Sequence, residues 1–306
     1  MTLNCKQIVN ALAVLCMCMS IGYVVKGQTP GHPKLREKIV ELNKGSSGQL
    51  GVAIKLLGSD DTFSYHDSSR YPMQSVFKFP IAFLLLKAVD EGRLKLNDSI
   101  LIRKSDLHKT VSALLEKYPD GNKKVPVEEV LTLMVTLSDN NACDILMRLL
   151  GGPDKLTADL HKMGVINMEI KGNEFQMYQN WALQYQNWSR PSAQVGLLEK
   201  LYTGSVLSKH SNALLMDLML KTYVAPGRIR GALPAGTPVA HRSGTSGTNK
   251  RGLSPATNDV GIITLPNGKH LATAVFLTDS YDDPVKRDKV IAEIAKAAFE
   301  EFNPQL

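Results

Sequence analysis

Ser75 and Lys78 form the first pair in the chain whose residue types and spacing could do chemistry. They lie three positions apart at the start of an apolar run, so a helix there would place both side chains on one face, within hydrogen-bond reach. An amine held in this way can take the serine proton when burial favours its neutral form, and the helix N-terminus stabilises the resulting anion. The pair alone is weak support, because a Ser-x-x-Lys match arises by chance about once in a chain of this length. An ordinary helix start is the alternative.

Ser138, Asp139 and Asn140 form a second group, in a break between two predicted helices. A tripeptide of this kind is expected by chance in roughly a few per cent of chains of this size. Ser, Asp and Asn all favour the N-cap position, so the group is also expected to begin a helix over residues 141–150. A capping role and a chemical role can hold together.

Arg242, Ser243 and Gly244, followed by Thr245, form a third group at the end of a predicted strand. A cation, a hydroxyl group and an unobstructed backbone side by side are what a bound carboxylate and a developing oxyanion require. The tripeptide by itself is unremarkable as a sequence, and a strand-end turn is the alternative.

The elements that would position these groups follow an α+β order. Strand-like segments lie near both ends of the chain, and helical spacing of apolar residues fills the middle. The chain would therefore leave a sheet, build an all-helical lobe and return to complete an antiparallel five-stranded sheet flanked by the terminal helices, with a cleft between the lobes. The sheet lobe is predicted over about residues 28–70 and 225–306, and the helical lobe over about 71–224. The predicted helices are residues 33–43, 75–91, several between 127 and 220, and 284–302, and the predicted strands are 49–57, 62–66, 239–242, 259–265 and 270–277.

Two local features qualify this pattern. Pro80 cannot donate to a carbonyl one turn back, so either the regular helix begins near Phe77 or its first turn is distorted. Residues 172–188 are rich in amide and aromatic side chains and are predicted to be irregular. Trp181 and Trp188 in this segment are expected to pack the loop rather than to contact a substrate.

Residues 1–27 are predicted to be a secretory signal peptide. Lys6 precedes an apolar run over residues 8–25, and the small residue Gly27 follows it. The run is short for a bilayer span and is interrupted by polar residues, so a retained membrane anchor is the less favoured alternative. A lipoprotein anchored at Cys16 or Cys18 is another alternative, disfavoured by the bulky residues that precede these cysteines.

The charge and composition exclude several classes of function. The 306-residue chain has a formal charge of +7, with its cations scattered, and no basic run is interleaved with aromatic residues. Nucleic-acid binding therefore has little support. The seven histidines lie far apart, so no catalytic zinc site is expected. Signal cleavage would leave Cys143 as the sole cysteine, without a partner for a disulfide, and we expect it to be a buried apolar residue.

The three motifs, in this order and about 60 and then about 100 residues apart, resemble the serine β-lactamase and penicillin-binding protein family, whose motifs are Ser-x-x-Lys, Ser-Asp-Asn and Lys-Thr-Gly. The likeness includes the terminal helices, the strand order and the helical middle, so it covers essentially the whole mature chain. It implies a class A serine β-lactamase, which hydrolyses penicillins and cephalosporins and confers antibiotic resistance. Such an enzyme is periplasmic and monomeric, needs no metal or cofactor, and is free of the membrane after signal cleavage.

The resemblance also implies a role for each motif residue. Ser75 would attack the lactam carbonyl, and the backbone N–H groups of Ser75 and Thr245 would form the oxyanion hole. Lys78 would accept or relay the serine proton, and Ser138 would pass a proton to the departing ring nitrogen. Asn140 would bind the side-chain amide of the substrate.

The third motif would hold the carboxylate of the substrate, through Arg242, Ser243 and Thr245 on either side of Gly244. Arg242 stands where the family commonly has lysine, although some class A members, including carbenicillin-hydrolysing ones, carry arginine. Arginine keeps the charge and adds a bidentate fork, so binding is expected to survive with altered selectivity.

Glu174 lies where class A enzymes carry the glutamate that activates water for deacylation. The family pattern there is commonly Glu-Pro-x-x-Asn, whereas this chain has Glu-Phe-Gln-Met-Tyr at residues 174–178. The lack of proline argues against a cis bond after Glu174, and Tyr178 cannot hold a water as an amide does. This departure resembles the PER and VEB branch, known for hydrolysis of extended-spectrum cephalosporins. An exposed loop acid is the alternative for Glu174, and Glu169 is the nearest other candidate.

Two other functions share the three motifs. A cell-wall DD-peptidase needs no deacylating glutamate, and a β-lactam sensor is acylated and stays so. The short chain, the lack of an anchor and the presence of Glu174 count against the DD-peptidase. Sensor domains are normally fused to a membrane segment, and none is predicted after the signal here. Whether Lys78 or the glutamate is the base for acylation stays open.

Overall fold

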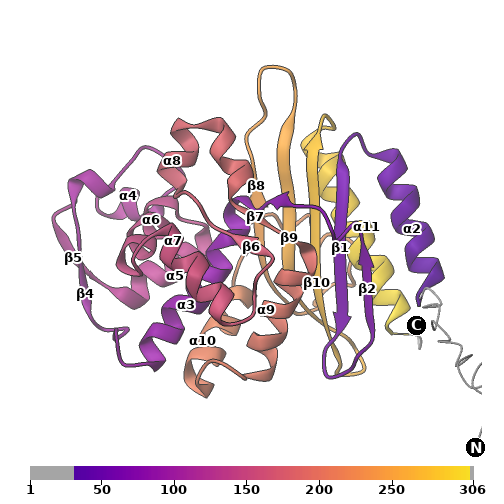
Figure 1. Ribbon diagram of the computed structural model, residues 1–306, viewed down its shortest axis with the longest axis horizontal. Helices are drawn as coiled ribbons and strands as arrows, with labels where there is room; N and C mark the ends of the chain where they lie inside the picture. The colour runs from indigo at the N-terminus through magenta and orange to yellow at the C-terminus, as the bar shows by residue number, and fades with distance from the viewer. Residues whose placement is uncertain (1–30, 304–306) are drawn as a thin grey trace, which may run out of the picture. The chain divides into compact units, whose positions relative to one another are not determined.

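A computed structural model describes residues 31–303 of the chain (Figure 1). The predicted signal peptide, residues 1–27, lies outside this range. An antiparallel sheet of five strands in the order β2-β1-β10-β9-β8 forms one part of the fold, and the pairing of β1 with β10 joins the two ends of the described sequence. The strands are β1 Gln49–Leu56, β2 Thr62–Tyr65, β8 Val239–Thr245, β9 Ser254–Thr264 and β10 His270–Ser280.

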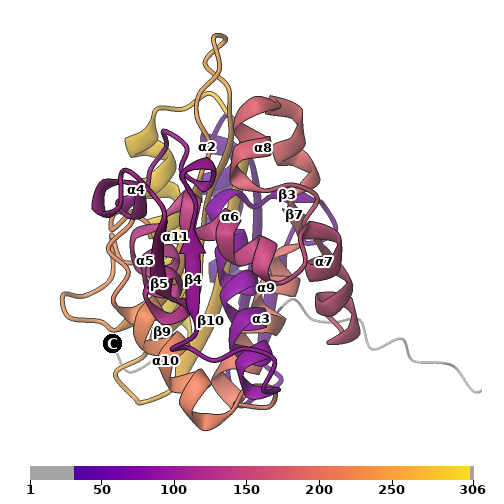
Figure 2. The same cartoon turned by 90° about the vertical axis from the view of Figure 1, so that its left-hand side faces the viewer.

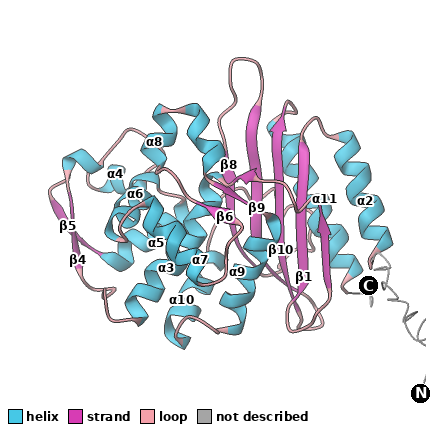
Figure 3. Ribbon diagram, viewed as in Figure 1, coloured by secondary structure: helices cyan, strands magenta, loops and turns pink. Residues whose placement is uncertain are grey.

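Two helices from opposite ends of the described chain cover one face of this sheet (Figures 1 and 3). They are α2, Pro33–Gly45, and α11, Pro284–Glu301. Apolar residues recur at helical spacing on both helices, and the buried ones pack with alternate residues of β1 and β10 in one core cluster. Burial of each large aliphatic side chain there is worth about 1.5–3 kcal/mol. This cluster holds the two ends of the described chain together.

A group of helices covers the other face, with α3, Lys78–Asp90, buried among them (Figure 2). Almost every residue of α3 is apolar and buried, which is expected of a helix enclosed on all sides. The predicted α+β fold is confirmed. The surrounding helices are α4 Ala113–Lys117, α5 Val127–Leu137, α6 Asn140–Leu149, α7 Pro153–Lys162, α8 Glu174–Gln179, α9 Pro191–Thr203 and α10 Lys209–Leu220.

The entry into α3 follows from Pro80. Residues Gln74–Phe77 form a single 3₁₀ turn, and the α-helix begins at Lys78. Pro80 then lies in the first turn, where its missing N–H would have had no partner within the helix. Both alternatives drawn from the sequence therefore contribute, a distorted turn and a late start.

Several elements differ from the sequence prediction. Strand β8 continues to Thr245 and β9 begins at Ser254, several residues beyond the predicted ends. Polar side chains such as Asn258 interrupt the apolar pattern there, because they bond to backbone on the helical side; Asn258 donates to the carbonyls of Pro72 and Met73. The segment 172–188 contains α8 and a 3₁₀ helix, Trp181–Gln186. Short strands that the sequence did not reveal are β3 Tyr71–Pro72, β4 Ser99–Ile102, β5 Lys123–Pro126, β6 Met168–Glu169 and β7 Trp188–Ser189.

No helix within residues 31–303 combines the length and the apolar run that a bilayer span requires. The connection from β8 to β9, residues 246–253, extends past the neighbouring strands beside α8 (Figures 1 and 2). Its tip is organised by Asn249, whose side-chain oxygen accepts from the backbone N–H groups of Arg251 and Leu253. This hairpin and α8 border the same end of β8.

Candidate active site

Ser75 and Lys78 meet at the start of α3, as their spacing predicts. The Nζ atom of Lys78 lies 2.8 Å from the Oγ atom of Ser75, and the lysine side chain is fully buried. Ser75 belongs to the 3₁₀ turn that precedes the helix, so the helix N-terminus begins three residues later. The hydroxyl group therefore has an amine in hydrogen-bond contact on its inner side.

Three further residues bond to the same amine. Its Nζ atom lies 2.6 Å from Oε1 of Glu174, 2.6 Å from Oδ1 of Asn140 and 3.0 Å from the carbonyl oxygen of Ser138. The Ser138 hydroxyl is 3.3 Å away. A buried ammonium group is tolerated only when it is paired and hydrogen-bonded, and here a carboxylate and several oxygen atoms supply both.

The second motif is both a helix cap and a part of the site. Asp139 is the N-cap of α6 and accepts from the backbone N–H of Ala142. Ser138 closes α5 in the left-handed conformation, with φ 62°, which turns the chain between the two helices. Both roles proposed for this tripeptide can thus be served by one turn. Asn140 spans the site, because its amide nitrogen also donates to Oγ1 of Thr110 at 2.8 Å.

Strand β8 forms the opposite wall. Arg242 is fully buried and donates to the Ser138 hydroxyl. Burial lowers the pKa of Arg242 to about 10, although the Glu174 carboxylate opposes this effect, so the side chain stays cationic at neutral pH. Its Nε and Nη1 atoms are buried and have no protein partner within the described residues. These N–H groups are therefore donors that no acceptor of the described protein satisfies.

Gly244 is required by the close approach of β8 to the 3₁₀ turn. A Cβ atom at this position would lie 2.3 Å from the carbonyl oxygen of Met73 and 3.1 Å from the backbone nitrogen of Ser75. Real Cβ atoms do not approach backbone oxygen so closely. The absence of a side chain at residue 244 therefore brings the strand end next to the nucleophile.

Arg228 is a site residue that sequence reasoning missed. It is buried in the connection between α10 and β8, and its guanidinium donates to the carbonyls of Gly244 and Asn258, each at 2.9 Å. It also donates to Oγ1 of Thr245 at 2.6 Å and pairs with Asp288 at 2.7 Å. A single arginine in an irregular segment carries no local signal, so only the structure reveals this second cation beside Thr245.

Glu174 is held against the nucleophile by the first turn of α8. Its Oε1 atom lies 3.3 Å from the Ser75 hydroxyl, and only 11% of its side chain is exposed. Asn173 caps the helix, and its side chain and that of Gln176 bond reciprocally to each other's backbone N–H group. The peptide bond after Glu174 is not cis, as the sequence predicts. Glu169, the other candidate, lies in β6 and pairs with Trp188.

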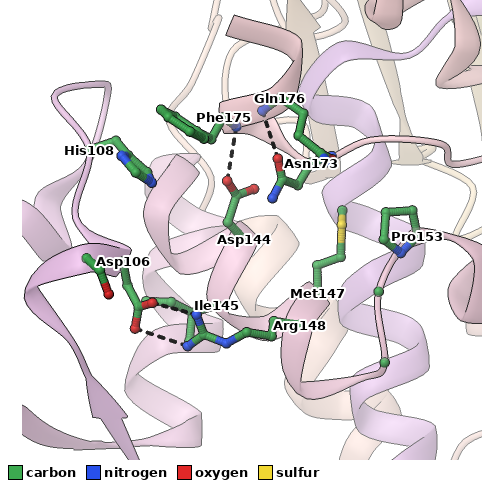
Figure 4. A pocket seen from close by; sticks show the side chains of 13 residues that line it. Asp106, His108, Asp144, Ile145, Met147, Arg148, Pro153, Asn173, Phe175 and Gln176 are labelled. Carbon is green, nitrogen blue, oxygen red and sulfur yellow. Dashed lines mark hydrogen bonds and ion pairs between the residues drawn. The ribbon is translucent and has the colours of Figure 1, made fainter. Parts of the chain in front are cut away.

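Asp144 on α6 anchors this turn, and no sequence pattern singled out this residue. One carboxylate oxygen accepts from the backbone N–H group of Glu174 at 2.8 Å. The other accepts from the backbone N–H group of Phe175 at 3.0 Å (Figure 4). Burial raises the pKa of Asp144 to about 7, and the bond from the Glu174 N–H acts against this rise. The carboxylate therefore fixes the backbone on both sides of the Glu174 side chain.

Residues of all three motifs, together with Glu174, line one cleft of about 660 Å³, whereas Lys78 and Arg242 are fully buried. Polar groups of all three motifs lie on its inner side, and apolar or aromatic side chains border its mouth. Trp181 is among them, with 43% of its surface exposed, whereas Trp188 is buried and has the guanidinium of Arg70 over its ring. The expectation that both tryptophans pack the loop rather than contact a substrate stays a prediction, and Trp181 borders the cleft. The lining residues include Ser75, Thr110, Val111, Leu137, Ser138, Asn140, Glu174, Met177, Tyr178, Trp181, Val224, Ser243, Thr245 and Gly247.

Within residues 31–303, no three His, Cys, Asp or Glu side chains gather in a group that could hold a metal ion. The groups that can do chemistry in the cleft are the hydroxyl of Ser75, the amine of Lys78, the carboxylate of Glu174 and the cation of Arg242. A hydroxyl beside an amine and a carboxylate can act as a nucleophile, and the carboxylate can also activate a water.

Known proteins match this chain over most of its length. The sequence family described as the Beta-lactamase enzyme family matches residues 34–302. The β-lactamase VEB-1 of Pseudomonas aeruginosa is 38% identical over 92% of this chain and 95% of its own length. The extended-spectrum β-lactamase PER-1 of the same species is 37% identical over 96% of this chain and 94% of its own length.

Solved structures agree with the sequence matches. The structure of the extended-spectrum β-lactamase TLA-1 superposes with a TM-score of 0.87 at 41% identity, covering 89% of this chain and 99% of TLA-1. A β-lactamase from Chitinophaga pinensis superposes with a TM-score of 0.86 at 43% identity, covering 88% of this chain and all of its own. The family and the fold suggested by the three motifs are both confirmed. The chain belongs to the class A serine β-lactamases, on the branch that includes VEB-1 and PER-1, and is a β-lactam hydrolase.

Proposed function

We propose that this β-lactamase opens its substrates through an acyl-enzyme on Ser75 and that Glu174 activates the water that releases the product. The observation that carries the proposal is the meeting of three groups: the Ser75 hydroxyl lies 2.8 Å from the Lys78 amine and 3.3 Å from the Glu174 carboxylate. This arrangement gives the hydroxyl a proton acceptor for attack and places a carboxylate where it can later act on water.

In the acylation step, the Oγ atom of Ser75 forms a bond to the lactam carbonyl carbon. The proton of the hydroxyl passes to the Lys78 and Glu174 pair, whose facing atoms are 2.6 Å apart. The N–H groups of Ser75 and Thr245 hold the oxyanion, which the approach of β8 at Gly244 makes possible. The result of the attack is a tetrahedral intermediate.

Collapse of this intermediate breaks the ring carbon–nitrogen bond. The departing nitrogen takes the proton of the Ser138 hydroxyl, which Lys78 can replace across 3.3 Å. The cation of Arg242, which bonds to the same hydroxyl, favours the transfer by stabilising the oxygen when it loses its proton. Ser75 then carries an ester of the opened substrate.

In the deacylation step, Glu174 takes a proton from a water molecule whose oxygen attacks the ester carbon. The bond from that carbon to the Oγ atom of Ser75 breaks, and the serine regains its proton from Lys78. Asp144 holds the backbone at Glu174, so the carboxylate stays directed at the ester. A DD-peptidase or a β-lactam sensor would lack this step.

The substrate would be held at both ends. Asn140 would accept or donate to its side-chain amide, and Arg242, Ser243 and Thr245 would bind its carboxylate, with Arg228 adding a second cation beside Thr245. Penicillins and cephalosporins carry both groups. The partly aromatic mouth of the cleft and the extended-spectrum relatives support cephalosporins with bulky side chains as substrates.

We further propose that the enzyme acts as a monomer in the periplasm after removal of residues 1–27. The apolar run of that segment supports export. Antibiotic resistance would follow, because ring opening there removes the drug before it reaches its targets.

Labelling with a fluorescent penicillin tests the nucleophile. Wild-type protein is expected to show a covalent label during turnover, and Ser75→Ala is expected to show none. Peptide mass spectrometry should place the adduct on the peptide that contains residue 75. Persistent labelling of Ser75→Ala would show that Ser75 is not the nucleophile.

A further inference from the structure

Trp181 occupies an unusual place on the cleft wall. It begins the 3₁₀ helix Trp181–Gln186 and lines the cleft together with Ser75 and Thr245. A Cβ atom added to Gly247 would lie 3.9 Å from Cζ3 of Trp181, so the indole edge faces the β8–β9 hairpin. The ring therefore bridges the 172–188 segment and the hairpin at the mouth of the cleft.

The backbone of Trp181 is fixed relative to the nucleophile. Its carbonyl oxygen accepts from Nε2 of Gln184 at 2.8 Å, and Oε1 of Gln184 accepts from Nε2 of Gln74 at 2.6 Å. Gln184 is buried, and Gln74 directly precedes Ser75 in the chain. This pair of amides links the tryptophan to the residue next to the nucleophile. A ligand that stacks on the indole therefore costs the protein little conformational entropy.

The indole of Trp181 keeps part of its surface free in the cleft. Within residues 31–303, no aromatic ring and no cation stacks on Trp181, whereas Trp188 carries Arg70 and is buried. A large flat side chain that is 43% exposed in a cleft offers its surface to a bound molecule. Val111 and Leu137 are exposed apolar residues that line the same cleft.

The geometry points to Trp181 as a specificity-determining residue that stacks on an aryl or heteroaryl ring in the acylamino side chain of the β-lactam. The inference rests on the proposed function. With the carboxylate held at Arg242 and the side-chain amide at Asn140, the group beyond the amide is the part of the substrate left to reach the mouth of the cleft. Offset stacking of two aromatic rings adds about 0.5–1.5 kcal/mol to the burial of their surface.

Two penicillins with the same ring nucleus test this contact by steady-state kinetics. Benzylpenicillin carries a phenyl side chain, and 6-aminopenicillanic acid carries none. Trp181→Ala is expected to raise KM for benzylpenicillin about tenfold with little change in kcat, since the contact is the same in the ground and transition states. Its KM for 6-aminopenicillanic acid should change less than about twofold, and Trp181→Phe should keep most of the preference. Tyr202→Ala removes an exposed aromatic on α9 that does not line the cleft, and it should change neither value.

An equal rise in KM for both penicillins would overturn the inference, because it would show a general effect on the cleft. No rise for benzylpenicillin would overturn it as well. Neither outcome contradicts the proposed function, because a KM can be measured only while the enzyme opens the β-lactam ring. If wild-type protein opens neither penicillin, the proposed function is lost and the inference with it.

Intrinsic fluorescence gives a second readout that does not depend on rate. The chain has two tryptophans, and only Trp181 lies in the cleft. In the Glu174→Gln variant, acylation by benzylpenicillin should change the tryptophan emission. The change should be much smaller when 6-aminopenicillanic acid acylates the same variant. It should also be much smaller when benzylpenicillin acylates the double variant Glu174→Gln, Trp181→Phe. Intact mass spectrometry confirms the adduct in each sample. An equal emission change with both penicillins, or one that persists without Trp181, would contradict stacking.

Discussion

Lys78 is the residue on which the chemistry of the cleft converges. Its amine contacts a residue of each group that the mechanism uses for proton transfer: Ser75, Ser138 and Glu174. A proton can therefore move between the nucleophile, the ring-nitrogen donor and the water-activating carboxylate without rotation of a large side chain. Single substitutions in the site can therefore separate effects on substrate binding, measured as KM, from effects on the chemical steps, measured as kcat.

Arg242→Ala is expected to act mainly on substrate binding. A hydrogen bond to a charged group contributes about 1.5–3 kcal/mol, so its loss should raise KM by roughly ten- to a hundredfold. Arg242→Lys keeps the charge and should recover much of the affinity. Steady-state kinetics with a penicillin and a cephalosporin measures both variants. An unchanged KM in Arg242→Ala would mean that the carboxylate binds elsewhere.

Gly244→Ala should disrupt the contact between β8 and the turn that carries Ser75. The new Cβ atom would lie 2.3 Å from the Met73 carbonyl oxygen, and neither backbone can yield easily. We expect a loss of about 1–3 kcal/mol in the free energy of unfolding and a large fall in kcat. Gly196→Ala on α9 is the matched control, because a Cβ there meets nothing within 4 Å and alanine favours helix. Wild-type activity in Gly244→Ala would refute the account of this glycine.

Asp144 should make stability depend on pH. Its pKa is raised to about 7 in the folded state by burial, so the folded protein binds a proton there that the unfolded chain has lost above about pH 4. The contribution of Asp144 to the free energy of unfolding should therefore fall as the pH rises from about 4 through 7. Asp144→Asn removes this dependence, so its stability relative to wild type should improve between pH 5 and 8 in urea titrations. Asp60→Asn, an exposed control, should show no such trend; a trend of the opposite sign would contradict the argument.

At the scale of elements, the terminal helices are joined by a contact that can be titrated. His32, which precedes α2, bonds to Asp61 at 2.7 Å and to Glu301 at the end of α11 at 3.1 Å, and its ring lies on Phe302. Burial opposes protonation, but the two carboxylates together raise the pKa of His32 above its usual value. The imidazolium therefore ties the first helix to the last.

His32→Gln should lower stability more in acid than in base. The stabilisation by His32 is fully present below its ordinary pKa of about 6.5 and is lost as the pH rises through the higher folded-state value. The difference between wild type and variant in the free energy of unfolding should thus be larger at pH 5.5 than at pH 8.5. Urea titrations at the two values measure it, with His210→Gln on α10 as an exposed control. Equal differences at both values would show that the ion pairs contribute nothing.

The elements themselves were predictable wherever apolar residues follow a period. The two terminal helices and the inner parts of the five strands show such periods, and helix α3 was predictable from its continuous apolar run. The ends of β8 and β9 were not predictable, because polar residues such as Asn258 bond across to the helical side there. The lobe boundaries near residues 70 and 225 and the signal peptide at 1–27 stay predictions.

At the scale of the whole molecule, the site unites residues that are up to about 170 positions apart. The three motifs could be found in the sequence because they occur together, in one order and at characteristic separations, although the first and third are weak signals alone. Asp144 and Arg228 could not, since each is a single charged residue whose partners are backbone groups from distant segments. Trp181 shows the same limit: its packing role was inferred from residue type, and only the position of the hairpin reveals that the ring borders the cleft.

The most direct test of the mechanism is the rate of cephalosporin ring opening by the mature enzyme and by Glu174→Gln, with intact mass spectrometry of both during turnover. We predict that wild type turns over without a lasting adduct, while the variant is acylated and accumulates a stable adduct of the opened cephalosporin. A wild-type protein that itself stays acylated, or a variant that releases product at the wild-type rate, would contradict the assignment of Glu174 as the deacylating base.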